Sequence, residues 1–179
     1  MFSGENADGI SADGCDISST VFESCRFTEC EFERAYFKNV RFVSCDLSNI
    51  KMLGCTFREC TFEQCKMTGS SITEALTEKS RFISCGCSYA AFGGSTFKST
   101  IFTDCRMNEA GFSDAVFKAS QLNGCNLTGC DFGGADLGCI DLSSCNIDNA
   151  RFSLSSLKGV TVSYSQAAEL ARLMGVKIV

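Results

Sequence analysis

Residues 25–49 read CRFTE CEFER AYFKN VRFVS CDLSN when they are written five at a time. The third residue of each group is Phe or Leu, and the first is Cys, Ala or Val. In an extended chain, side chains two residues apart point to the same side. We therefore predict that each group is a short extended segment that points one small and one large side chain inward and then turns.

The same five-residue period extends far to either side of this stretch. From Ile17 to Leu157 there are 29 of these third positions, here called centre positions, and 27 of them hold Phe, Leu, Met or Ile. The exceptions are Thr77 and Cys87, and all 16 Phe residues of the chain, Phe2 included, lie in the register. The predicted core centre positions include Phe22, Phe27, Phe32, Phe37, Phe42, Phe57, Phe62, Phe82, Phe92, Phe97, Phe102, Phe112, Phe117, Phe132 and Phe152.

This period excludes the commoner architectures. A repeat of five drifts around an α-helix of 3.6 residues per turn and leaves no apolar stripe. Antiparallel hairpins need turn signals every eight to twelve residues, and the sequence has no such grouping. A chain that turns a corner at every unit buries every centre residue, and its stacked coils pair as parallel strands. The fold class is therefore predicted to be all-β, a parallel β-solenoid.

Segments such as CRFTE, CEFER, CDLSN, CTFRE, CNLTG, CDFGG, ADLGC and CNIDN resemble the pentapeptide-repeat family, whose consensus is A/C-D/N-L/F-x-x. The resemblance covers residues 15–162. It implies four units per coil, and so a right-handed quadrilateral parallel β-helix of about seven coils for the 29 units.

The two ends of the chain depart from the repeat. Residues 1–14 have small residues at the centre positions, Ala7 and Ala12, and are predicted to form an N-terminal cap or a partly ordered first coil. Residues 163–179 predict a helix that Ser163 or Ser165 caps, followed by a short strand. We expect this element to cover the last coil and to form a dimer contact. The candidate dimer interface comprises Leu170, Leu173, Met174, Val176 and Ile178.

Twelve of the 14 cysteines occupy the small inward register. With four units per coil, seven of them are predicted to stack as one internal column: Cys25, Cys45, Cys65, Cys85, Cys105, Cys125 and Cys145. We interpret them as small buried hydrophobes, in preference to metal ligands or disulfides. The chain has no His and no phosphate-binding glycine motif, so no catalytic residue, metal or cofactor is predicted, and the protein is expected not to be an enzyme.

Composition also bears on location and partners. No run of apolar residues is long enough for a membrane span, and the first residues lack the features of a signal peptide. A cytoplasmic protein with reduced thiols is therefore predicted. The net charge of -5 disfavours direct binding to nucleic acid or to an anionic membrane.

Charge is unevenly distributed over the predicted coils. One face carries a basic column, which comprises Lys38, Arg58, Lys98, Lys118 and Lys158. Between residues 119 and 150 there is no Lys or Arg. The candidate partner-binding acidic surface comprises Asp131, Asp136, Asp141, Asp148, Asp114 and Glu109.

The end of the chain resembles the Qnr-type quinolone-resistance subfamily in its order of Gly159-Val160, Gln166-Ala167, an apolar helix, Gly175 and an apolar strand. The resemblance implies a dimeric DNA mimic that binds DNA gyrase or topoisomerase IV. One difference is that no loop interrupts the repeat. The alternative hypothesis is a pentapeptide-repeat scaffold for an unidentified protein partner.

Overall fold

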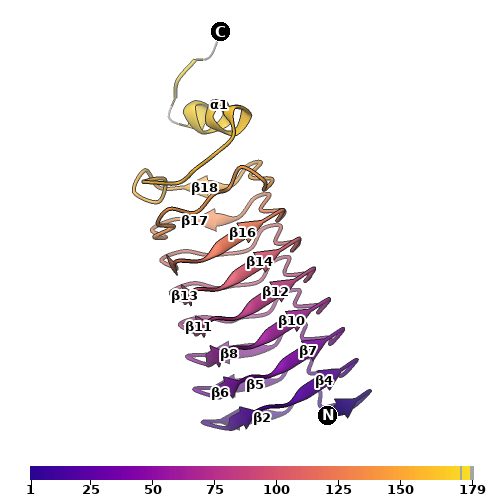
Figure 1. The fold of residues 1–179 in the computed structure, drawn as a ribbon. Coiled ribbons are helices and arrows are strands. Elements are labelled where there is room, and N and C mark those ends of the chain that lie inside the picture. The colour runs from indigo at the N-terminus through magenta and orange to yellow at the C-terminus, as the bar shows by residue number, and fades with distance from the viewer. Residues whose placement is uncertain (174, 178–179) are drawn as a thin grey trace.

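The five-residue period folds, in a computed structural model that describes residues 1–173 and 175–177, into stacked coils of twenty residues. Each strand pairs in parallel with the strand one coil later, as Phe62 pairs with Phe82. About eight turns form a solenoid, and one short helix follows them (Figure 1). The predicted parallel β-solenoid is confirmed. The 29 units account for about seven of these turns, and the first residues of the chain form most of one more.

The strands form the walls of the solenoid. The seven-stranded sheet contains β1 (Phe2–Ser3), β4 (Val21–Glu23), β7 (Arg41–Val43), β10 (Thr61–Glu63), β12 (Arg81–Ile83), β14 (Ile101–Thr103) and β16 (Gln121–Asn123). The six-stranded sheet contains β3 (Asp16–Ser18), β6 (Tyr36–Lys38), β9 (Thr56–Arg58), β11 (Leu76–Glu78), β13 (Thr96–Lys98) and β15 (Val116–Lys118). A third wall contains β2 (Ser11–Asp13), β5 (Glu31–Glu33), β8 (Lys51–Leu53), β17 (Asp131–Phe132) and β18 (Arg151–Phe152).

The corners of the coils have a repeated backbone conformation. Positive φ angles recur at the second residue after the centre positions, for example 57° at Glu59 and 52° at Ser84. This left-handed conformation disfavours residues with a Cβ, yet 19 non-glycine residues adopt it within the described part of the chain. The hydrogen bonds between coils compensate, since the corner N–H of Glu59 donates to the Glu78 carbonyl at 2.9 Å.

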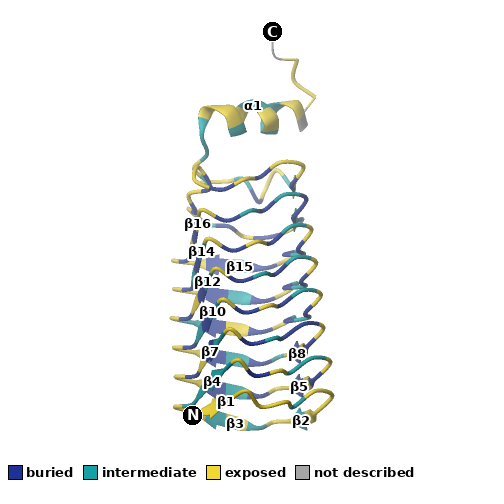
Figure 2. Cartoon of the chain, turned by 90° about the vertical axis from the view of Figure 1, so that its right-hand side faces the viewer, coloured by how far each residue is buried: buried dark blue, intermediate teal, exposed yellow. Residues whose placement is uncertain are grey.

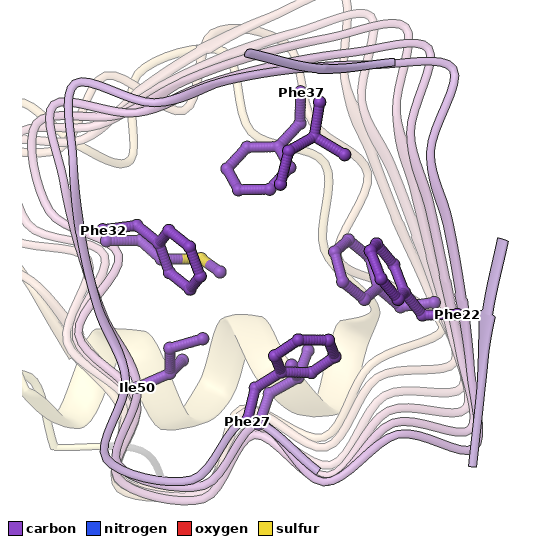
Figure 3. Close-up of a pocket in the computed structure, with 9 residues that line it drawn as sticks. Phe22, Phe27, Phe32, Phe37 and Ile50 are labelled. Carbon is purple, nitrogen blue, oxygen red and sulfur yellow. The ribbon is translucent and has the colours of Figure 1, made fainter. Parts of the chain in front are cut away.

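The core consists of side chains stacked from coil to coil. The ring centroids of Phe62 and Phe82 are 4.6 Å apart and their planes differ by 4°. Figure 3 shows Phe22, Phe27 and Phe32 projecting from different walls into the interior, where the remaining hollow has a volume of only about 10 Å³. Of the fifteen Phe residues predicted for the core, twelve are buried, and the three near the ends of the rod are partly buried and pack against the core: Phe22, Phe27 and Phe152.

The two exceptions to the apolar centre register are also buried. The Thr77 hydroxyl lies 2.8 Å from that of Thr100, and the Thr100 hydroxyl also donates to the Thr77 carbonyl at 3.2 Å. Cys87 is fully buried, with its Sγ 3.9 Å from the Met67 sulfur. Polar partners therefore accompany the smaller residues inside the coil, and the register passes through both positions without a break.

The seven cysteines predicted to form a column are all buried. Most of their thiols donate to the carbonyl of a residue 23 positions earlier, as Cys65 donates to Phe42 and Cys85 donates to Phe62, both at 3.3 Å. Burial also raises the pKa of Cys60, in a neighbouring column, to about 11. The column thiols are therefore hydrogen-bond donors within the core, and the Cys60 thiol is neutral at pH 7. Cys139 is the one exposed cysteine in the described part of the chain.

Residues 1–14 form most of a first coil. Strands β1 and β2 pair with β4 and β5, and Asn6 bridges to Arg26. Burial is lower here than in the middle of the rod (Figure 2), and Phe2 is 51% exposed. The small side chains of Ala7 and Ala12 fill less of the interior than the large centre residues of later coils. This explains why the sequence pattern is weakest where the coil is least buried.

Helix α1 (Tyr164–Leu173) lies across the end of the last coil (Figure 2). Ser163 caps it, because its hydroxyl accepts from the Gln166 N–H at 3.3 Å while the Gln166 Oε1 accepts from the Ser163 N–H at 2.7 Å. The Gln166 side-chain amide also donates to the Leu142 and Cys145 carbonyls, each at 2.8 Å. Gly175, at a φ of 79°, ends the helix. The helix is thus anchored to carbonyls that have no further coil to pair with.

The aromatic stack predicts a large cost for truncation in the middle of the rod. Phe62→Ala is expected to lower the free energy of unfolding by about 3–5 kcal/mol, because it leaves a cavity between two neighbouring rings. Urea unfolding followed by circular dichroism measures the loss. Tyr89→Ala is the control, since Tyr89 is 67% exposed and its truncation is expected to cost under about 0.5 kcal/mol. A loss below about 1 kcal/mol for Phe62→Ala would contradict the stacked core.

Thiol burial predicts the reactivity of the native protein. Titration with a disulfide reagent is expected to modify one thiol per chain rapidly, that of Cys139, with the partly buried Cys15 following slowly. Cys139→Ser is expected to abolish the rapid phase, whereas Cys60→Ser leaves it intact. The remaining thiols react once denaturant is added. Rapid modification of several thiols without denaturant is the result that this core does not allow.

Candidate interaction surface

The acidic surface is built on the turns of the last coils. Asp131, Asp136 and Asp141 occupy the same place in three consecutive five-residue units, directly before a centre residue. In each, the carboxylate Oδ1 accepts the backbone N–H two residues later, at 2.9, 3.0 and 2.8 Å respectively. These local turns fix the direction of the carboxylates on successive walls of the rod.

The remaining members lie at corners. Asp148 is exposed, and its N–H donates to the Asn146 side chain at 2.9 Å. Glu109 and Asp114 are exposed corner residues with positive φ angles of 57°. Glycine in the next coil leaves room for their carboxylates. A Cβ at Gly129, for example, would lie under 3.0 Å from the carboxylate of Glu109. The sequence therefore accommodates these acids by the choice of residue one coil away.

Ionisation and pairing differ among these acids. Hydrogen bonds from Ser143 hold the pKa of Asp141 below its usual value, so the group stays anionic at neutral pH. Asp131 has a partner within the chain, since Arg151 Nη2 lies 3.2 Å from its carboxylate. Sequence reasoning missed this pair, although a separation of twenty residues is the signal that identifies it. Asp136, Asp141 and Asp148 are the exposed acids of the last coils that form no ion pair in the described structure.

The candidate dimer residues divide into two groups. Leu170 is partly buried and packs against the core together with Val160 and Val162, so it faces the last coil. Val176 is 51% exposed beyond the helix. Met174, Ile178 and the side chain of Leu173 lie outside the described part of the structure.

Other kinds of site find little support in the part of the chain that is described. Residues 1–173 and 175–177 contain no group of three or more Cys, Asp or Glu residues that is arranged to hold a metal ion. The described residues also include no helix long and apolar enough to cross a bilayer.

The solenoid is similar to those of solved pentapeptide-repeat structures. HetL, a pentapeptide repeat protein involved in heterocyst differentiation regulation in the cyanobacterium Nostoc sp., is similar with a TM-score of 0.56 and 15% identity, over 90% of this chain and 91% of that one. A trypsin-treated form of QnrB1, a plasmid-mediated fluoroquinolone resistance protein, has a TM-score of 0.51 and 16% identity over 99% of each chain. At these identities the likeness concerns the fold alone. No curated protein matches the chain.

The family described as pentapeptide repeat region matches residues 15–92 and 77–152. These two overlapping matches cover most of the coils, and they fall within the stretch over which the five-residue register runs unbroken. The chain belongs to the pentapeptide-repeat family.

Proposed function

We propose that this protein is a non-catalytic, dimeric DNA mimic whose acidic surface occupies a DNA-binding surface of DNA gyrase or topoisomerase IV and so modulates quinolone action. The observation that carries the proposal is the absence of any Lys or Arg between residues 119 and 150, together with carboxylates that backbone N–H groups hold on successive walls. Asp131, Asp136 and Asp141 lie five residues apart on successive walls and so spread negative charge around the last coils. A cationic DNA-binding surface attracts such an array in place of phosphates.

The family supports the coarser part of this proposal. Pentapeptide-repeat proteins are generally non-catalytic scaffolds, and the filled interior of this solenoid leaves recognition to the outer surface. QnrB1 is described as a fluoroquinolone resistance protein and shares the solenoid fold. The finer part, a topoisomerase partner, rests on this likeness and on the acidic surface together.

A second candidate is a scaffold for a different protein partner. HetL supports it, because this protein of the same fold, with a higher TM-score, is described as involved in heterocyst differentiation regulation. The acidic surface serves either function. An assay with purified topoisomerase separates them, since only the first candidate requires an effect on that enzyme.

Supercoiling by DNA gyrase provides the first test. Micromolar protein is expected to inhibit supercoiling in a manner that excess DNA relieves, and to raise the quinolone concentration needed for half-inhibition. The triple variant Asp136→Lys, Asp141→Lys, Asp148→Lys is expected to weaken both effects at least about tenfold, because it reverses the charge that the enzyme recognises.

A matched variant makes the same charge change elsewhere on the rod. Glu29→Lys, Glu59→Lys, Glu74→Lys alters three exposed corner acids outside the acidic surface and is expected to keep both effects within about twofold. Circular dichroism verifies that both triple variants are folded. Wild-type protein without any effect at micromolar concentration would sink the topoisomerase proposal, as would equal losses in the two variants.

Light scattering tests the proposed dimer. The full chain is expected to have about twice its mass of 19.3 kDa. Val176→Asp is expected to give a monomer with an unchanged melting temperature, because this side chain is 51% exposed in the single chain. The control Tyr89→Asp alters an exposed residue in the middle of the rod and should leave the dimer intact. A wild-type mass of 19.3 kDa would refute the dimer.

A further inference from the structure

A second interaction surface lies on the six-stranded sheet, and it adjoins the acidic surface at its C-terminal edge, where Asp136 bridges to Val116. The register between strands aligns Lys38 with Arg58, Arg58 with Glu78, Glu78 with Lys98, and Lys98 with Lys118. The four cations, which we call the central basic column, are all exposed. Strands β11 and β13 of this sheet lie one above the other in Figure 1. The column therefore runs along the axis of the solenoid, across the strands.

Glu78 stands in the middle of this column and orders part of it. Arg58 donates to its carboxylate from Nε at 2.8 Å and from Nη2 at 2.6 Å, and Lys98 Nζ lies 3.2 Å away. The hydrogen bonds from Arg58 and Lys98 lower the pKa of Glu78, and the contribution of Arg58 is the larger. Four cations and one anion leave the column at +3, on a chain whose net charge is -5. Lys38 and Lys118 form no ion pair within the described residues.

An apolar and hydroxyl column runs beside the basic one. It comprises the residues two positions earlier on the same strands, which point to the same side of the sheet: Tyr36, Thr56, Leu76, Thr96 and Val116. Leu76 is 37% exposed and the others are partly buried. The wall thus presents two parallel stripes, one largely positive and one of apolar and hydroxyl side chains.

The chemistry of the two stripes favours a protein partner over a nucleic acid. Single-stranded nucleic acids gain affinity by stacking bases on aromatic rings or on guanidinium planes. Here Tyr36 is the single aromatic residue of the stripe, and the guanidinium of Arg58 is engaged with Glu78. Aliphatic side chains such as Leu76 and Val116 complement apolar side chains, and the lysines complement carboxylates.

The spacing of the columns favours a helix over a strand as the occupant. Neighbouring coils are about 4.8 Å apart, so the members of the column recur at that interval, and Arg58 and Lys98 are separated by about twice that distance because Glu78 lies between them. Residues on one side of a β-strand are about 6.7 Å apart and fall out of step with the column. Residues three and four apart on an α-helix rise by about 4.5 and 6 Å, with a mean near 5.3 Å, which follows the column more closely.

We infer that this wall of the solenoid binds an acidic amphipathic helix of a partner protein, laid parallel to the solenoid axis. Its carboxylates face Lys38, Lys98 and Lys118, and its aliphatic stripe covers Leu76 and Val116. About 13 helical residues span the distance of about 19 Å from the first cation to the last. The inference does not rest on the topoisomerase proposal, because the residues that carry it are the cations and apolar side chains of the six-stranded sheet and not the acidic surface.

Fluorescence anisotropy with synthetic probes tests the inference. The probe is a labelled three-heptad helical peptide with a Glu stripe at intervals of three and four residues and a neighbouring Leu stripe. A second peptide carries Gln in place of every Glu, and a labelled single-stranded oligothymidylate represents nucleic acid. The Glu peptide is expected to bind the wild-type protein, more weakly as salt is added, and at least about tenfold more tightly than the Gln peptide.

Protein variants locate the binding. Lys38→Glu with Lys118→Glu is expected to weaken binding of the Glu peptide at least about tenfold, and Leu76→Ser to weaken it about threefold. The control Arg81→Glu with Arg106→Glu makes the same charge change at exposed residues on other walls and should alter the affinity by less than about twofold. The inference is overturned by absent binding, by equal affinity for the Gln peptide, by equal losses in the two double variants, or by tighter binding of the oligothymidylate.

Discussion

Each coil is held to the next by backbone hydrogen bonds between residues about twenty positions apart, and the other features of the molecule follow from that register. Bonds such as Thr56 N–H to the Ala35 carbonyl, at 2.9 Å, satisfy the polar groups of strands that are only two or three residues long. They also place like positions above one another. The stacked rings of Phe62 and Phe82, the thiols of Cys65 and Cys85, and the charges of the central basic column are three results of the same alignment.

The alignment also decides where recognition takes place. Inward positions are filled with Phe, Cys and similar residues, so partner binding falls to the outward positions, where a residue type repeated every twenty positions becomes a stripe. This chain uses that property on the six-stranded sheet, whereas the carboxylates of the last coils recur at five-residue intervals on successive walls. Carboxylates held by turns gather near the C-terminal coils, and cations gather on the six-stranded sheet, with Glu78 between two of them.

The spacing of Phe and Cys was sufficient to predict the coils, because every five-residue unit repeats the same burial. Three features lay beyond that reasoning. The face of α1 that meets the coil depends on the Gln166 amide bonding to the Leu142 and Cys145 carbonyls, so the apolar pattern alone did not assign Leu170 to the cap. The pair of Asp131 and Arg151 joins residues that are distant in sequence but adjacent in space. The first coil was left open because Ala7 and Ala12 carry little of the pattern that identifies the others.

The left-handed corners have a consequence for how this family can diversify. Two residues of each unit are fixed by the core, and a third must accept a positive φ, which Ser, Glu, Lys and even Tyr do here. The fold therefore tolerates substitution of most outward side chains, and no insertion into the repeat is needed to change the surface. That freedom explains how chains of 15% and 16% identity keep one architecture over nearly their whole length. In such a family the buried positions preserve the fold, whereas the exposed positions determine the partner. Binding specificity can therefore change while the core stays the same.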